Sequence, residues 1–332
     1  MPGICGIIPC GPSGGLRPML ASMLDRMKHH AWYVVEQGGA EGDNVLFGRI
    51  SLGFGTAPAQ PFASDDGSWA VLDGELYDAE DARGPLERQG LRFTGESHAE
   101  ILLRGCLSDG AAFLGRTRGK FAAAIWDGPR RRLLLVNDRF GMRPLYYAQT
   151  EDGLLFASEI KALLEAPDLE VEPNEEAVRR FLLDGVVDFS EQTFFHGITR
   201  LPPAHNLLVR FEPGLRLDYG RYWSYPPQDG EVSEPQAPAR LRELLEDSVR
   251  LHARSDVPVG TCLSGGLDSS SIVCLAEHLR AGGQVPRYTH SAFGYLPQDE
   301  AFSERRHMQS VVDTTGARLF HVNPPVERFV EE

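Results

Sequence analysis

Short apolar runs separated by turn residues fill the chain as far as about residue 222. Five of these runs have the length and β-branched or aromatic character of strands; they cover residues 45–54, 69–72, 121–126, 132–137 and 154–157. Three segments instead repeat apolar residues at helical spacing; they cover residues 16–27, 80–89 and 99–106. Many strands with few helices predict an α+β arrangement of stacked sheets flanked by helices.

A different pattern begins after a polar, proline-rich stretch at residues 224–238, which we interpret as a linker. Helix-like and strand-like segments then alternate; they cover residues 239–251, 257–263, 269–280, 288–293, 303–315 and 318–322. Alternating strands and helices predict an open parallel sheet of the α/β type. We therefore predict a first domain at 1–222, a linker at 223–238 and a second domain at 239–332.

Composition narrows the class of protein. The 332 residues suffice for about two domains, and a hydrophobic content of 42% is typical of folded chains. We find no apolar run of membrane-spanning length and no signal-peptide pattern. The net charge of −14 disfavours nucleic-acid binding. Five scattered cysteines without a C-x-x-C pair argue against a disulfide framework or a zinc site, so we expect a cytoplasmic protein.

The clearest chemical signal is a glycine- and serine-rich turn between an expected strand and an expected helix. It reads Leu263-Ser264-Gly265-Gly266-Leu267-Asp268-Ser269-Ser270. Glycines let the backbone approach a phosphate closely, and a helix N-terminus attracts anions. Asp268 would repel a phosphate and is suited to hold Mg²⁺ beside it. The alternative is an ordinary Gly-Gly turn before a serine-capped helix.

This turn lacks the G-K-[ST] ending of a Walker loop. It resembles the S-G-G-x-D-S signature of ATP pyrophosphatases, which cleave ATP between the α and β phosphates. The resemblance implies ATP and Mg²⁺ as cofactors. It assigns the β and γ phosphates to Ser264, Gly265, Gly266, Ser269 and Ser270, with Asp268 as metal ligand. Leu263 and Phe293 would flank the adenosine.

Three further segments extend the resemblance over nearly the whole chain. They are D-G-E-L-Y at 73–77, N-D-R-F-G-M-R-P-L-Y-Y at 137–147 and F-A-S-E-I-K-A-L at 156–163. Together with the loop they resemble the asparagine synthetase family. That family implies an N-terminal nucleophile (Ntn) glutaminase domain with an αββα sandwich, joined to an ATP-pyrophosphatase domain that forms an amide through a carboxyl-adenylate.

The expected glutaminase site departs from the family pattern. In the family, the nucleophile is a cysteine that directly follows the initiator Met. Once Met is removed, the α-amino group of that cysteine acts as the base. The matching residue here is Cys5, whose nitrogen would remain an amide even after Met1 is removed. The family's glutamine-binding Asn is replaced by Asp73, next to Gly74, which matches the family. The Asp that would pair with the α-ammonium of the substrate is replaced by His98. Arg49 fits the expected carboxylate-binding arginine.

We therefore predict an impaired glutaminase, with Cys5 as a buried thiol of the first strand; the alternative is proteolytic exposure of its amine. The sequence is similar to the branch with β-lactam synthetases and lasso peptide cyclases, which use an amine on the substrate. Competing hypotheses are an intact glutamine-dependent synthetase and a non-catalytic nucleotide-binding subunit. The second hypothesis arises because the family's second nucleotide motif, S-G-E-G-x-D-E, is missing from this chain and the synthetase domain looks truncated.

Several further interpretations follow from the same patterns. Substrates would be a small-molecule or peptide carboxylate and glutamine or an amine donor. The partner would be a second copy of the chain or a complementary synthetase chain. We expect His29 and His30 at the surface and residues 130–132 in a solvated hairpin turn. Cys262 and Cys274 are expected in the core beside the loop.

Overall fold

The computed structural model describes residues 2–11, 14–40, 45–54, 58–188, 190–211, 214–227, 232–255, 257–285, 291–297 and 303–323. The chain divides into two compact units, Met1–Pro226 and Pro227–Glu332. Each is described by itself below. Among the described residues, no helix combines the length and the apolar character that crossing a bilayer requires.

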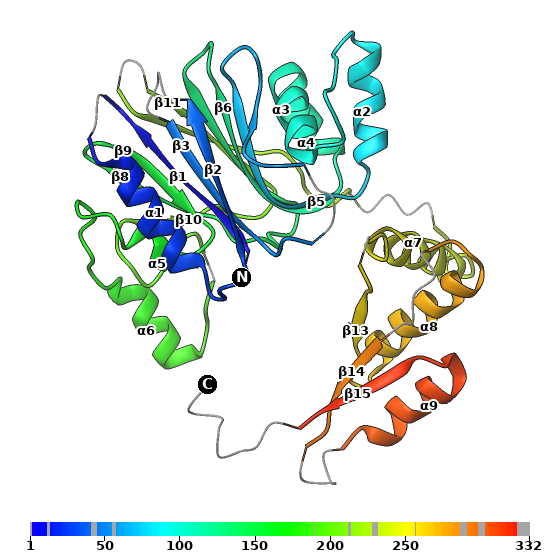
Figure 1. Ribbon diagram of the computed structural model, residues 1–332. Helices are drawn as coiled ribbons and strands as arrows, with labels where there is room; N and C mark the ends of the chain where they lie inside the picture. Colours follow the sequence, from blue (N-terminus) through cyan, green and yellow to red (C-terminus); the bar gives the residue numbers. More distant parts are fainter. Residues whose placement is uncertain are drawn as a thin grey trace. The chain divides into compact units, whose positions relative to one another are not determined.

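The first unit contains two six-stranded antiparallel sheets (Figure 1). The first sheet has the order β10-β8-β9-β1-β3-β2, formed by β10 (Ile198–Arg200), β8 (Tyr146–Thr150), β9 (Gly153–Ala157), β1 (Gly3–Pro9), β3 (Val45–Ser51) and β2 (Val34–Ala40). The second has the order β12-β11-β7-β6-β5-β4, formed by β12 (Arg216–Arg221), β11 (His205–Arg210), β7 (Arg132–Asn137), β6 (Gly119–Asp127), β5 (Trp69–Leu76) and β4 (Phe62–Ala63).

Helices cover the outer faces of these sheets. The first sheet packs against α1 (Leu16–Met27) and α5 (Ile160–Leu163). The second packs against α2 (Ala79–Arg88), α3 (His98–Asp109) and α4 (Ala111–Arg116). The layers are therefore helix, sheet, sheet, helix, which confirms the αββα sandwich predicted from the family resemblance.

The side-chain alternation of β6 shows why the apolar runs are so continuous. Ala122, Ala124 and Trp126 point into the core between the two sheets. Their neighbours Ala123 and Ile125 point into the core under α2, α3 and α4. Because successive strand residues face opposite sides, a strand buried on both faces is apolar at every position.

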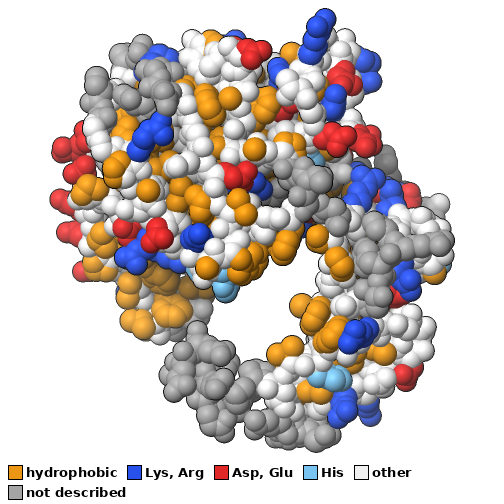
Figure 2. Space-filling view, in the orientation of Figure 1, with side chains coloured by type: hydrophobic (Ala, Val, Ile, Leu, Met, Phe, Trp, Pro, Cys, Tyr) orange, Lys and Arg blue, Asp and Glu red, His pale blue; other side chains and the backbone are white. Residues whose placement is uncertain are grey.

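One helix of the first unit contributes little to these cores. In α6 (Glu175–Asp184) only Ala177 is buried. Leu182 and Leu183 are 74% and 69% exposed, and Figure 2 shows hydrophobic side chains gathered over this helix.

The predicted hairpin turn is present: Arg130 and Arg132 both pair with Asp127 between β6 and β7. His29 lies at the surface and pairs with Glu159.

The second unit contains a three-stranded parallel sheet in the order β13-β14-β15, which confirms the predicted α/β pattern (Figure 1). Its elements are α7 (Ala237–His252), β13 (Gly260–Cys262), α8 (Leu267–Ala281), β14 (Ser291–Tyr295), α9 (Arg305–Thr315) and β15 (Arg318–Val322). β13 is shorter than the predicted 257–263. Pro258, which has no N–H for a ladder, lies in the part that is not strand.

Two cysteines of this unit correct an expectation. Cys262 and Cys274 are exposed rather than in the core. Cys274 lies outside the face through which α8 buries Val273, Glu277 and Leu279, and Cys262 is on the exposed side of β13. Along β14, Ala292 and Gly294 are likewise buried, whereas the alternating residues Phe293 and Tyr295 remain exposed.

Candidate functional site

The glycine- and serine-rich turn lies where the parallel sheet predicts a ligand site. It connects the carboxyl end of β13 to the first residue of α8. In open parallel sheets ligands bind outside the carboxyl ends of the strands, next to helix N-termini. The loop therefore lies between a strand and a helix of the parallel sheet, as predicted.

The loop backbone needs glycine. Gly265 has a φ of 86°, in the left-handed region that disfavours other residues. A Cβ atom there would lie 3.0 Å from Cβ of His307 and 3.1 Å from the carbonyl oxygen of Glu304. Gly266 is the residue that precedes α8. Gly265 therefore allows a tight reversal before the first turn of the helix, whereas Gly266, at a φ of −69°, has a backbone that other residues can adopt.

The serine hydroxyls line this reversal. Ser264 Oγ lies 3.0 Å from Ser269 Oγ, and the amide of Ser264 donates to Ser269 Oγ at 3.2 Å. The amide of Gly266 donates weakly to Ser264 Oγ at 3.4 Å. Ser264 is exposed, and Ser269 and Ser270 are partly exposed. These hydroxyls can therefore exchange their mutual contacts for an anion.

The donor set fits a magnesium–phosphate group. The first turn of α8 contributes amides that lack helical partners, and Asp268 is exposed in that same turn. Mg²⁺ is commonly held by one or two carboxylates together with phosphate oxygens. Among the described residues no group of three or more His, Cys, Asp or Glu could hold a metal by itself. Asp268 thus fits a metal that arrives with a phosphate.

The two residues expected to flank the adenosine differ. Leu263 is 1% exposed and packs in the core with Val273 and Ala292, so its side chain cannot contact a nucleotide. This expectation was wrong because Leu263 points toward the helices that cover the sheet. Phe293 is 43% exposed and stacks on Phe320 with ring centroids 5.3 Å apart. Phe293 can therefore present an aromatic face to a ligand.

A second candidate site is a cavity of about 550 Å³ in the first unit. It is lined by Pro2, Val34, Glu36, Arg49, Ser51, Leu52, Gly53, Phe54, Asp73, Gly74, Glu75, Lys120 and Arg143. Three of the predicted glutamine-site residues, Arg49, Asp73 and Gly74, therefore meet in one place. The cavity is large enough for an amino acid.

Ion pairs occupy most of the charges in this cavity. Arg49 Nη1 lies 2.6 Å from Glu36, and Lys120 Nζ lies 2.8 Å from Glu75. The third pair is looser: Arg143 Nε lies 3.6 Å from Asp73. A carboxylate ligand at Arg49 must therefore compete with Glu36 for the guanidinium.

Asp73 is the most buried charged residue of this cavity, with 5% of its surface exposed. Burial raises the pKa of its carboxyl, and the positive charges of Arg143 and Arg49 partly oppose that rise. The adjacent Gly74 has a φ of 107°, and a Cβ atom there would lie 1.9 Å from the carbonyl oxygen of Lys120. This glycine is therefore obligatory for the way β5 meets β6.

The prediction of Cys5 as a buried thiol of the first strand is confirmed, whereas the match of Cys5 to the position of the family nucleophile is wrong. Cys5 is 0% exposed and packs with Met23 and Met27 of α1 on the outer face of the first sheet. Burial raises the pKa of its thiol well above the usual range, so the reactive thiolate is suppressed. The residue that lines the cavity at this end of β1 is Pro2. Proline has neither a thiol nor a hydroxyl to act as nucleophile.

His98 does not line the cavity. It begins α3, and its Nδ1 accepts a hydrogen bond from the amide of Leu76 at 3.2 Å. Burial lowers the pKa of the imidazole, which keeps it neutral near pH 7. The structure therefore gives His98 a role in joining α3 to the end of β5.

Sequence reasoning missed Pro2, Glu36, Glu75, Lys120 and Arg143 as cavity residues. Glu75 and Arg143 stand inside the D-G-E-L-Y and R-F-G-M-R-P segments, so they could have been assigned. Glu36 and Lys120 belong to no motif and are brought to the cavity only by the pairing of β2 with β3 and of β5 with β6.

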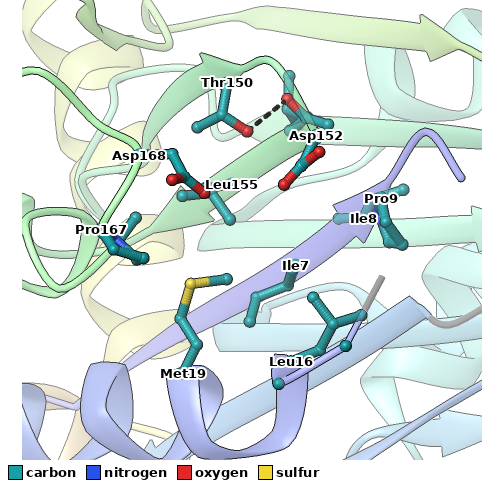
Figure 3. Close-up of a pocket in the computed structure, with 15 residues that line it drawn as sticks. Ile7, Ile8, Pro9, Leu16, Met19, Thr150, Asp152, Leu155, Pro167 and Asp168 are labelled. Atoms are coloured by element: carbon teal, nitrogen blue, oxygen red, sulfur yellow. Dashed lines mark hydrogen bonds between the residues drawn. The ribbon is translucent and has the colours of Figure 1, made fainter. Parts of the chain in front are cut away.

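Another cavity, of about 230 Å³, lies at the opposite end of β1 (Figure 3). Its floor is apolar, with Ile7, Leu16 and Met19, and Asp152 and Asp168 lie at its edge. It contains no predicted site residue and no set of groups with evident chemistry. It shares no residue with either candidate site.

Comparisons with known proteins agree with both units. A family model described as glutamine amidotransferase domain matches residues 1–223. A second, described as asparagine synthase, matches residues 240–331.

Individual relatives are longer than this chain. "Asparagine synthetase [glutamine-hydrolyzing] 3" of Bacillus subtilis is 33% identical over 265 residues, 78% of this chain and 42% of that protein. "Amidase chry2" of Gibberella zeae is 36% identical over 225 residues, 66% of this chain and 32% of that protein. A "Putative asparagine synthetase [glutamine-hydrolyzing]" of Mycobacterium tuberculosis is 31% identical and aligns over 95% of this chain and 51% of its own length. The chain thus spans between a third and a half of these proteins.

Proposed function

Because the chain belongs to the asparagine synthetase family, we propose that it is the amidotransferase-like part and the nucleotide-loop part of an ATP-dependent amide-forming ligase. The observation that carries the proposal is the turn between β13 and α8, with its left-handed Gly265, its serine hydroxyls and the open first turn of α8. The rest of the nucleotide pocket would come from the remainder of the synthetase domain.

The proposed reaction has two steps. An oxygen of a substrate carboxylate attacks the α-phosphorus of ATP, the bond to the bridging oxygen of the β-phosphate breaks, and pyrophosphate leaves. An amine nitrogen then attacks the acyl carbon, a proton is lost from nitrogen, and AMP leaves with the carboxylate oxygen. Hydroxyls of Ser264, Ser269 and Ser270 and the amides of α8 would hold the departing pyrophosphate, and Asp268 would hold a Mg²⁺ that supplies positive charge there.

Pyrophosphate exchange tests this proposal. With the remainder of the synthetase domain present, labelled pyrophosphate is expected to enter ATP only when a suitable carboxylate is added, because the first step is reversible before the amine arrives. Exchange that is absent across a panel of small-molecule and peptide carboxylates would contradict the ligase. Nucleotide binding without any exchange would instead support a non-catalytic nucleotide-binding subunit.

We also propose that glutamine hydrolysis is impaired, so that the nitrogen comes from an amine of the substrate or from free ammonia. Pro2 stands where the cavity needs a nucleophile, and Arg49 is already paired with Glu36. The carboxylate of Asp73 cannot donate to a carbonyl or to a developing oxyanion when it is ionised. The first feature removes attack, the second weakens carboxylate binding and the third removes oxyanion stabilisation.

Substitution of Cys5 separates this proposal from an intact glutaminase. Cys5→Ala is expected to leave release of glutamate from glutamine at the background level of the wild type. It should lower the free energy of unfolding by about 1 kcal/mol, because a small buried side chain is truncated within a packed core. Glutamate release well above background in the wild type that disappears in Cys5→Ala would restore the glutaminase reading. Ala162→Gly, a truncation in the same core, controls for a general loss of stability.

A further inference from the structure

The cavity between Arg49 and Asp73 has unmet needs that differ from those of a glutamine site. Its shortest ion pairs, Arg49 with Glu36 and Lys120 with Glu75, neutralise two cations. The nearest cationic atom to the buried carboxylate of Asp73 is Arg143 Nε, which comes no closer than 3.6 Å. That distance exceeds the usual length of a charged hydrogen bond. The deepest negative charge is therefore the least completely paired.

The second unmet need is a hydrogen-bond acceptor. Arg49 Nε is buried and has no hydrogen-bond partner, although Nη1 of the same guanidinium pairs with Glu36. A buried donor without an acceptor costs free energy that a ligand oxygen would recover. A ligand would therefore bind best here if it placed an anionic or carbonyl oxygen near Arg49 and a cation near Asp73.

Glutamine meets only one of these needs. Its α-carboxylate could reach Arg49 and its amide N–H groups could donate to Asp73, but it brings no positive charge to that carboxylate. An aliphatic chain that ends in an ammonium meets both, and Val34, Leu52 and Phe54 supply apolar surface for its methylenes. Pro2 has neither a thiol nor a hydroxyl to attack a bound molecule, so we expect that molecule to leave unchanged.

We propose that this cavity binds, without turnover, a basic amino acid of the ornithine or lysine class, with its carboxylate at Arg49 and its terminal ammonium at Asp73. The site is independent of the nucleotide loop, so it stands whether or not the chain activates a carboxylate. Binding there would make the amidotransferase-like unit a receptor for a cationic metabolite.

Calorimetric titration of the full chain tests the proposal with four probes. L-ornithine and L-lysine are the expected ligands, L-glutamine is the neutral-amide competitor, and L-norvaline has the carbon chain of ornithine without the terminal ammonium. The wild type is expected to bind L-ornithine or L-lysine at least tenfold more tightly than either L-glutamine or L-norvaline.

Asp73→Asn is the decisive variant because it replaces an acceptor by a donor of equal size. It is expected to lose at least tenfold in affinity for the basic amino acid and to reverse the preference toward L-glutamine. Asp152→Asn makes the same chemical change at the edge of the other cavity and should leave all four affinities unchanged (Figure 3).

Three outcomes would overturn the proposal. They are wild-type binding of L-glutamine as tight as that of L-ornithine and L-lysine, an unchanged preference in Asp73→Asn, and no heat of binding with any probe at millimolar concentration. Because the readout is a ratio of affinities within one variant, partial loss of folded protein does not imitate the expected result. Melting curves of both variants identify any that fails to fold, and Asp73→Ser then replaces Asp73→Asn.

Discussion

Replacing Asp268 by alanine is expected to lower the rate of ATP–pyrophosphate exchange by at least about 100-fold. Groups that merely orient a metal ligand already change affinity or activity by roughly 10–100-fold, and a direct carboxylate ligand should matter more. Asp268 is exposed in the first turn of α8, and its loss from the helix N-terminus should cost only about 0.3–1 kcal/mol of stability. The loss of exchange would therefore not result from unfolding.

The mechanism of that loss can be identified with a second variant. Asp268→Asn keeps an oxygen ligand without the charge, so raising the Mg²⁺ concentration should recover part of its exchange. Asp313→Ala on α9 is a matched control, since Asp313 is exposed and contacts Gln309 of the same helix. Exchange in Asp268→Ala that stays within twofold of the control would exclude Asp268 as the metal ligand.

Several strands that hold the fold together could be predicted because they are buried on both faces. β7 and β9 lie between the inter-sheet core and an outer layer, so their apolar runs are nearly unbroken and the predicted bounds match within one residue. β2 escaped prediction for a functional reason. Its Glu36 faces the cavity and two glycines follow, so the strand lacks an apolar pattern.

Cys5 shows the limit of matching by residue type: the predicted buried thiol is confirmed, but the match of this residue to the family nucleophile is wrong. The sequence has two cysteines near the N-terminus, Cys5 and Cys10, and Cys5 was matched to the family nucleophile by type. The paired strands decide otherwise: Cys5 lies opposite Gly48 and Ala157 in the interior of β1, with its side chain toward α1. A strand places each side chain by its position, so a nucleophile three residues further along cannot reach the same cavity.

The nucleotide loop and the amidotransferase-like cavity differ in how far sequence reasoning reached. The loop is local, so eight consecutive residues were enough to predict its strand–turn–helix context, with only the orientation of Leu263 wrong. The cavity is assembled from β2, β3, β5, β6 and the turn before β8, and its balance of ion pairs depends on pairings between distant strands. Glu36 and Lys120 are placed in the cavity by these strand pairings, so the local sequence around them does not predict their role.

Asp138 is expected to matter most for the stability of the first unit. Its carboxylate is 0% exposed and accepts three backbone hydrogen bonds, from the amides of Phe140 at 2.8 Å, Met142 at 3.0 Å and Phe121 at 3.1 Å. These contacts fold the turn after β7 and fasten it to β6. The turn leads directly to Arg143, so the same carboxylate determines where a cavity residue is placed.

Asp138→Ala is therefore expected to lower the free energy of unfolding of the first unit by about 3–5 kcal/mol, since three buried amides lose their acceptor and each costs roughly 1–3 kcal/mol with partial relaxation. All four tryptophans lie in residues 1–226, so denaturant unfolding followed by tryptophan fluorescence reports on this unit alone. Asp138→Asn keeps one acceptor oxygen and should fall between the wild type and alanine. Asp168→Ala, at an exposed position, should change the free energy by less than about 0.5 kcal/mol. A cost below about 1 kcal/mol for Asp138→Ala would mean that water replaces the carboxylate and that the turn, with Arg143, is held by its own backbone.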